Sequence, residues 1–334
     1  MPAIDGLRAV AVALVVAIHI FPTVLFPGEV GVDVFFVISG FLITLILLRQ
    51  QEQGSFRFGR FYVNRALRLY PPLVVVVIAT VLFGLLPGGS VREAAVNGAL
   101  SLLYLGNITM TLSGTWLGDL SHTWSLAMEE QFYLVWPLVL VLLVGAHLTR
   151  RGIAYVLAAA AIASAIGWIF TGEQLPFNPL TRCLGLIVGC ILALVTASVR
   201  KSSGALAGLG ALGFVAVLVL GSLGAINHMW TTLFAVVTIP FVILHLAFGR
   251  GPAVRVLSWG PIVYLGVISY EIYLWHYPLM AALRRLTDWD DWMIGVVAVP
   301  VTLVLSWATH RFISAPVLAR RDAYRARKLA ASRG

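Results

Sequence analysis

Charged residues are scarce in this sequence of 334 residues. Only 11% are Asp, Glu, Lys or Arg, whereas an average soluble domain has about 25%. Apolar residues make up 60%, and they come in blocks of about 20, the length that a helix needs to cross a membrane. This composition excludes an ordinary soluble domain. Because the blocks are continuous rather than alternating, they predict an all-α membrane protein rather than a β-barrel.

Cysteine is also rare, and its placement argues against a disulfide or a metal site. The two cysteines, Cys183 and Cys190, lie seven residues apart in an apolar run. This spacing puts them about 10 Å apart along a helix, too far for a disulfide. We therefore predict that both are small core side chains. No Cys or His spacing resembles that of a metal site, so no metal is expected.

The formal net charge of +9 does not by itself indicate a nucleic-acid partner. Most Lys and Arg residues lie in loops on one side of the predicted spans, as the positive-inside rule expects. The first apolar run lacks the small-residue cleavage site of a signal peptide, so we expect it to be retained as a helix. The sequence thus predicts a multi-pass protein, embedded in the lipid bilayer and without nucleic acid.

Ten apolar segments are predicted to cross the membrane as helices. An even number places both termini on one side, which the loop arginines mark as cytoplasmic. A further apolar stretch, 95–113, would reverse every later loop if it crossed, so we predict a short outer or re-entrant helix there. Residues 1–316 are assigned to the transmembrane domain and 317–334 to a basic cytoplasmic tail. The predicted spans are 7–26, 31–49, 71–87, 124–146, 153–170, 180–199, 205–224, 229–248, 260–283 and 292–313.

Ionisable residues inside membrane spans are costly, so each one is a candidate functional residue. Arg8 and His19 are 11 residues apart, about three helical turns plus 20°, so they share one helix face. The hairpin after the first span is expected to centre near Leu25, which would place Asp33 close enough to orient the His19 imidazole. A snorkelling Arg, a structural His and an Asp favoured by the helix dipole are the plainer alternatives.

Two adjacent carboxylates, Glu129 and Glu130, stand near the start of the span 124–146. Neighbouring residues of a helix point about 100° apart, so at most one of the two can face a given partner. We expect one to face the helix bundle and the other to face water. The alternative is an interfacial helix start, since Trp124 is typical of a membrane-interface aromatic residue and acids suit a first helical turn.

The segment FRFGRFYVNRALRLYPP is predicted as a cytoplasmic loop with Arg60, Arg65 and Arg68. Arg65 and Arg68 are three residues apart and would share a helical face, which suits the binding of phosphate. Sidedness and the binding of anionic lipid are the simpler explanation for the same arginines.

Three further polar residues fall in the span 260–283, within SYEIYLWHYPL: Tyr270, Glu271 and His276.

Five stretches of the sequence together resemble the membrane acyltransferase-3 family, bacterial O-acyltransferases that modify surface sugars and some antibiotics. They are IDGLRAVAVALVVAIHI, GVDVFFVISGFLIT, RFYVNRALRLYPP, HTWSLAMEEQFYLVWPL and SYEIYLWHYPL. They follow the family's order from residue 4 to about residue 279. Each stretch alone is a weak signal, whereas five in order on a chain with ten predicted spans are specific.

The resemblance implies transfer of an acyl group from cytoplasmic acyl-CoA, in particular acetyl-CoA, to a hydroxyl group. The residues that match the family's motifs are Arg8, His19, Arg65, Arg68, Glu129 and His276. One departure concerns the end of the last span. In HRFISAP, Ser314 occupies a position where the resemblance leads us to expect an acid.

On this basis we predict that His19 is the general base, which takes the proton of an acceptor hydroxyl as the hydroxyl attacks the thioester. Asp33 would hold the far nitrogen of His19, and Glu129 would bind acceptor hydroxyls or tune His19. No single donor to the oxyanion stands out, and Ser39, Tyr270 and backbone amides are the candidates. Two sets complete the prediction: Arg8, Arg60, Arg65 and Arg68 for acyl-CoA, and Glu130, Trp124, Tyr270 and His276 for substrate.

Several alternatives stay open at this stage. The acceptor is either a carbohydrate or glycoconjugate, or a macrolide or other glycosylated natural product. The acyl group either passes directly to the acceptor or is relayed through an acyl-histidine. A protein of a different class, a proton-coupled transporter or flippase, would use His19 and the acids as a proton relay.

Overall fold

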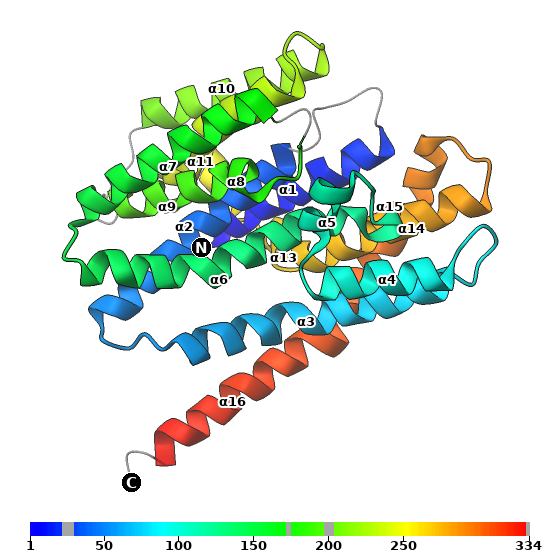
Figure 1. The fold of residues 1–334 in the computed structure, drawn as a ribbon, viewed down its shortest axis with the longest axis horizontal. Helices are drawn as coiled ribbons and strands as arrows, with labels where there is room; N and C mark the ends of the chain where they lie inside the picture. Colours follow the sequence, from blue (N-terminus) through cyan, green and yellow to red (C-terminus); the bar gives the residue numbers. More distant parts are fainter. Residues whose placement is uncertain (22–29, 172–174, 197–203, 332–334) are drawn as a thin grey trace. The chain divides into compact units, whose positions relative to one another are not determined.

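The computed structural model describes residues 1–21, 30–171, 175–196 and 204–331, and these form helices without any strand (Figure 1). The prediction of an all-α protein is therefore confirmed. The longer helices are α1 (Pro2–Ile20), α2 (Val30–Glu52), α3 (Phe58–Phe83), α4 (Val91–Leu102), α6 (Trp124–Gly145), α7 (Arg150–Thr171), α9 (Leu184–Thr196), α10 (Gly204–Ser222), α11 (His228–Phe248), α14 (Ser269–Leu286), α15 (Asp291–Thr309) and α16 (Ala315–Ala331). The shorter ones are α5 (Gly106–Ser113), the 3₁₀ turn η1 (Gly118–Thr123), α8 (Pro179–Arg182), α12 (Pro252–Leu257), α13 (Gly260–Val267) and the π-helical turn η2 (His310–Ser314).

Within the described ranges, nine helices are long and apolar enough to cross a membrane. They coincide with nine of the ten predicted spans, so the prediction of a multi-pass helical protein is confirmed. The pair α4 and α5 makes a tenth only if it is taken as one bent element. This pair covers the stretch 95–113 that the sequence predicts to be short or re-entrant. Tyr104 interrupts it with a left-handed backbone conformation (φ 53°).

The start of the third span was predicted wrongly. We expected a loop up to Pro71, whereas α3 begins at Phe58 and carries Pro71 and Pro72 in its interior. Proline removes one helical hydrogen bond and usually marks a helix start. Membrane helices tolerate it because neighbouring groups satisfy the freed carbonyls. The arginines of this segment therefore lie on a helix.

The ninth predicted span, 260–283, is also corrected by the structure. The chain forms two helices there, α13 and α14, which are separated at Ile268. Glu271 lies in the first turn of α14, a position where the helix dipole favours an acid. Of the polar residues that we placed inside a membrane span, Tyr270 and Glu271 therefore lie in the first turn of a new helix. The expected hairpin centre near Leu25 lies outside the described residues.

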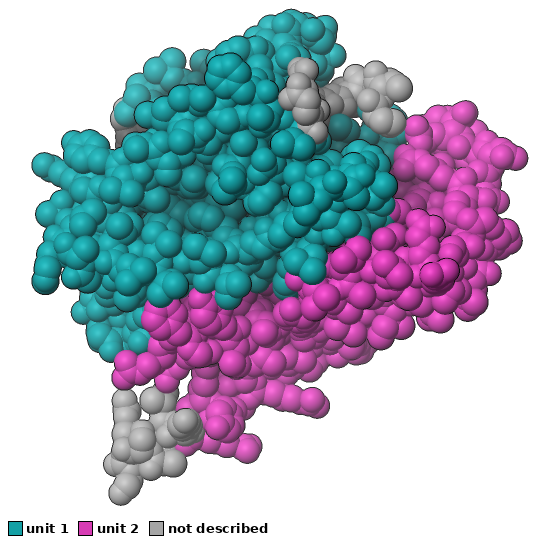
Figure 2. All heavy atoms as spheres, viewed as in Figure 1, with its two compact units in different colours: residues 1–56, 104–117, 121–269 teal, residues 57–103, 118–120, 270–334 magenta. Residues whose placement is uncertain are grey.

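The structure divides into two compact units, which Figure 2 colours separately. Unit 1 contains Met1–Phe56, Tyr104–Leu117 and Ser121–Ser269. Its centre is α2, which packs against α1, α6, α9 and α11. The contact between α2 and α9 requires glycine on both helices. A Cβ atom on Gly40 would lie 2.0 Å from the carbonyl oxygen of Leu186, and one on Gly189 would lie 2.2 Å from that of Val37.

Unit 2 contains Arg57–Leu103, Gly118–Leu120 and Tyr270–Gly334. In this unit α3 packs against α4, η2 and α16. Two side-chain hydrogen bonds hold α14 in place. The hydroxyl of Tyr270 donates to the carbonyl oxygen of Leu69 at 3.0 Å, and the indole of Trp275 donates to the Thr309 hydroxyl at 2.9 Å. The N-terminal turn of α14 therefore lies beside the arginine-bearing part of α3.

Candidate active site

His19 lies half-buried in the last turn of α1. Its Nδ1 atom is 2.7 Å from the carbonyl oxygen of Val15, one helical turn earlier. A carbonyl oxygen can only accept a hydrogen bond, so Nδ1 carries the proton and Nε2 is the basic nitrogen of the neutral ring. The backbone of α1 thereby holds the ring in one orientation, and the role of His19 as a general base stays a prediction.

Arg8 and His19 belong to one unbroken helix, so the predicted common face follows from their spacing. The Nη1 atom of Arg8 lies 3.9 Å from an oxygen of Asp5, three residues earlier. The Arg8 side chain is 15% exposed. The role of Arg8 in binding acyl-CoA stays a prediction.

Asp33 has a partner that the sequence analysis did not name. Its carboxylate binds the guanidinium of Arg182, with 2.9 Å between Oδ1 and Nη1. Gly31, two residues earlier, packs against Ala11 and Val15 of α1. At 1.5 Å of rise per residue, this register offsets Asp33 from His19 by about 12 Å along the helix axes. The structure thus shows His19 oriented by a backbone carbonyl and Asp33 bound to Arg182.

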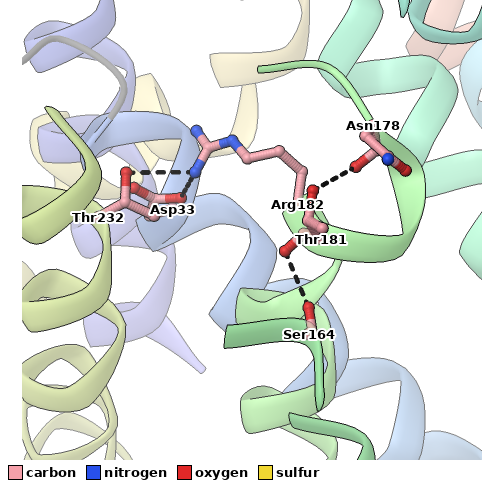
Figure 3. Close-up of polar contacts among 6 residues, drawn as sticks. All are labelled: Asp33, Ser164, Asn178, Thr181, Arg182 and Thr232. Carbon is pink, nitrogen blue, oxygen red and sulfur yellow. Dashed lines mark hydrogen bonds and ion pairs between the residues drawn. The ribbon is translucent and has the colours of Figure 1, made fainter. Parts of the chain in front are cut away.

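Arg182 is the residue that the sequence analysis missed (Figure 3). Its side chain is 1% exposed, as is that of Asp33. The same Nη1 atom lies 3.3 Å from the Thr232 hydroxyl. The signal was present in the sequence, because Arg182 falls inside the predicted span 180–199 and an ionisable residue there is a functional candidate.

Glu129 is the carboxylate of the adjacent pair that faces α2. It accepts hydrogen bonds from the hydroxyl groups of Ser39 on α2 and of Tyr133 on α6, the latter at 2.6 Å. Glu130 is half-buried and points about 100° away on the helix. A second polar link lies further along the same two helices, where the Trp136 indole donates to the Thr44 hydroxyl at 2.9 Å.

Trp124, the first residue of α6, lies in an aromatic cluster. Its ring contacts Phe36 edge-on at 6.3 Å and Phe177 at 5.2 Å between centroids. The Arg182 guanidinium lies over the same indole, with 5.4 Å from Cζ to the ring centroid. Trp124 is 6% exposed, so its contacts are those of a packed residue, and its predicted contact with substrate stays a prediction.

Unit 2 holds the second group of predicted residues. Arg60 and Arg68 are exposed on α3, and Arg65 is half-buried. Tyr270 binds the carbonyl of Leu69, next to Arg68. One further residue, His276, is completely buried, and its Nδ1 donates to the Tyr273 carbonyl at 2.6 Å. The roles of these residues in binding stay predictions.

The missing acid at position 314 has a counterpart nearby in unit 2. The Ser314 hydroxyl donates to Oε1 of Glu271 at 2.7 Å, and His310 Nδ1 lies 3.2 Å from the same oxygen. Glu271 and Ser314 are each 4% exposed. A buried carboxylate therefore does lie against the π-helical turn, but α14 supplies it.

Comparison with known proteins identifies the family of the chain. A family model described as an acyltransferase domain, numbered 3, matches residues 1–311. The peptidoglycan O-acetyltransferase OatA of Listeria monocytogenes (serovar 1/2a) is 27% identical over 347 residues. YrhL of Bacillus subtilis (strain 168), provisionally named a peptidoglycan O-acetyltransferase, is 31% identical over 347 residues.

These alignments cover 95% of this chain, but only 56% of OatA and 55% of YrhL. The chain therefore spans just over half the length of the curated relatives that it matches. No solved structure is similar to it at a significant level. Since the family model extends over nearly the whole chain and both relatives align along it, the chain belongs to the acyltransferase-3 family of multi-pass membrane proteins.

Proposed function

We propose that this protein is a membrane O-acyltransferase that moves an acyl group, in particular acetyl, from acyl-CoA to a hydroxyl group of a carbohydrate acceptor. The proposal places it in a bacterial cytoplasmic membrane. The single observation that carries it is the hydrogen bond from His19 Nδ1 to the Val15 carbonyl. This bond presents Nε2 of a half-buried imidazole as a base, in a chain of the acyltransferase-3 family.

The reaction needs one proton transfer in each direction. His19 Nε2 takes the proton from the acceptor O–H while the oxygen attacks the thioester carbonyl, and the C–S bond breaks as the tetrahedral intermediate collapses. The imidazolium returns this proton to the CoA thiolate. The products are the acyl ester and free CoA thiol, so atoms and charge balance without a further reactant.

The donor and acceptor are assigned by chemistry. Acyl-CoA carries several phosphate charges, and Arg60, Arg65 and Arg68 of α3 offer guanidinium groups for them. The relatives OatA and YrhL are named for peptidoglycan, which supports a polysaccharide acceptor with free hydroxyl groups. Glu129 is assigned to acceptor hydroxyls, because a carboxylate held by Ser39 and Tyr133 is a preorganised hydrogen-bond acceptor.

The test is a turnover assay on the purified full chain in detergent or nanodiscs. Acetyl-CoA is supplied with and without soluble peptidoglycan fragments, and free CoA thiol and acetylated sugar are measured together. We expect thiol release that depends on the acceptor, and a loss of at least about 100-fold in His19→Ala, the usual contribution of a general base.

His147→Asn is the matched control. His147 is exposed in a left-handed conformation (φ 58°) that Asn tolerates, so this variant should keep full turnover. A folded His19→Ala protein with full turnover would refute the assignment of the base. Proton-coupled uptake of a solute into proteoliposomes, without thiol release, would instead favour a transporter.

A further inference from the structure

Arg182 forms a buried ion pair that stability alone does not explain. Its side chain and that of Asp33 are each 1% exposed. Removing two charges from water costs several kcal/mol per ion, and the attraction between them often only offsets this cost. A pair of well-packed apolar side chains would stabilise the same position at least as well. The pair is therefore better explained by the geometry that it imposes on its neighbours.

Hydrogen bonds hold the backbone at Arg182 in place. Asn178 caps the single turn of α8, with its carbonyl oxygen 2.9 Å from the Arg182 nitrogen. The preceding residue, Thr181, accepts a hydrogen bond through its carbonyl oxygen from the Ser164 hydroxyl of α7 at 2.8 Å. Figure 3 shows the long side chain extending from this anchored turn to Asp33 and Thr232. The guanidinium thus joins α8 to α2 and α11.

Two indole rings hold the guanidinium in addition to the carboxylate. The Cζ atom lies 5.4 Å from the ring centroid of Trp124 and 5.1 Å from that of Trp168. A planar guanidinium stacks on aromatic faces in a way that a lysine ammonium cannot reproduce. Because Trp124 is the first residue of α6, this contact acts on the N-terminal end of α6.

Helices α2 and α6 are consequently joined at three levels. Asp33 reaches Trp124 through Arg182, Ser39 binds Glu129, and Thr44 binds Trp136. On α2 the first two levels are six residues apart, about 9 Å along the axis, and on α6 they are five residues apart, about 7.5 Å. Two links at similar spacing fix both the rotation and the shift of one helix against the other.

We propose that Arg182 is a positioning residue, which sets the first turn of α6 against α2 and thereby places the Glu129 carboxylate for catalysis. This inference rests on the acyl-transfer activity proposed above. Without the guanidinium, the links of Ser39 to Glu129 and of Thr44 to Trp136 remain. The first turn of α6 can then rotate about these two links. A displacement of about 1 Å at a catalytic group can cost about 100-fold in rate.

Two variants separate positioning from stability. Arg182→Lys keeps the charge and the pair with Asp33 but loses the flat surface between the indoles. The double variant Asp33→Asn with Arg182→Met removes both charges at similar volume, so no unpaired charge stays buried. Arg150→Lys is the matched control, because Arg150 forms an exposed ion pair with Glu52 that contributes little.

Three measurements are made on each protein: melting temperature, kinetics with acetyl-CoA, and hydrogen exchange by mass spectrometry over residues 121–131. We expect Arg182→Lys to melt near the wild-type temperature, to lose about tenfold in kcat and to keep KM for acetyl-CoA within twofold. Exchange in the first turn of α6 should become faster in both Arg182 variants. Arg150→Lys should match the wild type in all three.

The outcomes decide the inference in either direction. Wild-type kcat in Arg182→Lys, or in a double variant that also recovers the wild-type melting temperature, overturns it. So does failure of both variants to fold, because Arg182 is then a determinant of stability only. If the wild type itself transfers no acyl group, the proposed function fails. Hydrogen exchange still decides the positioning role in that case, and unchanged exchange over α6 overturns it.

Discussion

Ser39 of α2 donates its hydroxyl hydrogen to the carboxylate of Glu129 on α6, across 90 positions of sequence. Tyr133, one turn further along α6, donates to the same oxygen. Two hydroxyl donors on one carboxylate oxygen hold the carboxylate in one orientation. The Glu129 carboxylate, near the start of an apolar helix, therefore has Ser39 as a defined partner. The sequence alone does not reveal this pairing.

Replacing Glu129 by Gln tests whether the charge is needed for the reaction. The amide oxygen of Gln still accepts from Ser39 and Tyr133, so the fold should be retained. We expect kcat to fall about tenfold or more, because a hydrogen bond from an acceptor hydroxyl to a charged group contributes about 1.5–3 kcal/mol. KM for acetyl-CoA should stay constant. The measurement is steady-state thiol release with saturating acceptor.

Glu52→Gln is the control for this substitution. Glu52 forms an exposed ion pair with Arg150, and pairs of this kind contribute about 0–1 kcal/mol. Its turnover and melting temperature should equal those of the wild type. A Glu129→Gln protein with unchanged kcat would remove Glu129 from the proposed mechanism.

Exchanging Glu271 and Ser314 tests their direct contact in unit 2. Ser314→Glu alone would bring two buried carboxylates within hydrogen-bond distance, which strongly disfavours the charged form of one of them. Glu271→Ser alone would leave Ser314 and His310 without this acceptor, a loss of about 1–3 kcal/mol. The double variant restores one carboxylate and one hydroxyl, so it should be more stable than either single variant.

Thermal unfolding of the four proteins in detergent gives the coupling between the two positions. For residues in contact, the coupling free energy is about 0.5–3 kcal/mol. If the losses of stability in the two single variants simply add in the double variant, the hydrogen bond of 2.7 Å between Ser314 and Glu271 contributes nothing to stability.

The arginines of α3 are expected to govern the affinity for the donor. Each charge-assisted hydrogen bond to a phosphate contributes about 1.5–3 kcal/mol, so Arg65→Gln and Arg68→Gln should each raise KM for acetyl-CoA about tenfold or more. The value of kcat should change little, because these groups are assigned to the nucleotide end of the donor. Added salt should raise KM less in the variants than in the wild type.

Arg320→Gln and Arg321→Gln serve as controls of equal charge change. Both residues lie on α16, outside the part of α3 assigned to acyl-CoA. If these tail variants weaken donor binding as much as those at Arg65 and Arg68, net charge rather than a local phosphate site explains the effect.

Gly189 is expected to be intolerant of even one added methyl group. A Cβ atom there would lie 2.2 Å from the Val37 carbonyl oxygen and 2.8 Å from the Phe41 nitrogen, both backbone atoms of α2. Gly189→Ala should therefore destabilise the protein by about 1–3 kcal/mol. Gly208→Ala on α10 meets nothing within 4 Å and should be neutral or stabilising by up to about 1 kcal/mol. Equal melting temperatures of the two variants would contradict the close contact between α2 and α9.

Sequence patterns were sufficient for most helices but failed at two boundaries. A block of about 20 apolar residues determines a membrane helix locally, which is why nine predicted spans coincide with helices. The errors at Pro71 and near Ile268 arose where one local sequence feature is compatible with two different structures. Proline is compatible with a helix start or with a helix interior, and an apolar run can hold a break between two helices.

The candidate site was predictable only in part. The spacing of Arg8 and His19 within one helix follows from the sequence, because both lie on α1. The partner of Asp33 did not follow, because Arg182 is 149 positions away. A search for ionisable residues inside every predicted span would have found both Arg182 and Asp33, but not that the two bind each other.

The sequence by itself determined the helical class, the apolar spans and the motifs that indicate the family, because each depends on residues close together in the chain. The tertiary structure alone decided which buried polar groups meet: Asp33 with Arg182, Ser39 with Glu129, and Glu271 with Ser314. The physical reason is that a buried charge or hydroxyl must find a partner wherever the fold supplies one. In these three cases the partner is on a different helix, so the local pattern of apolar and polar residues does not specify it.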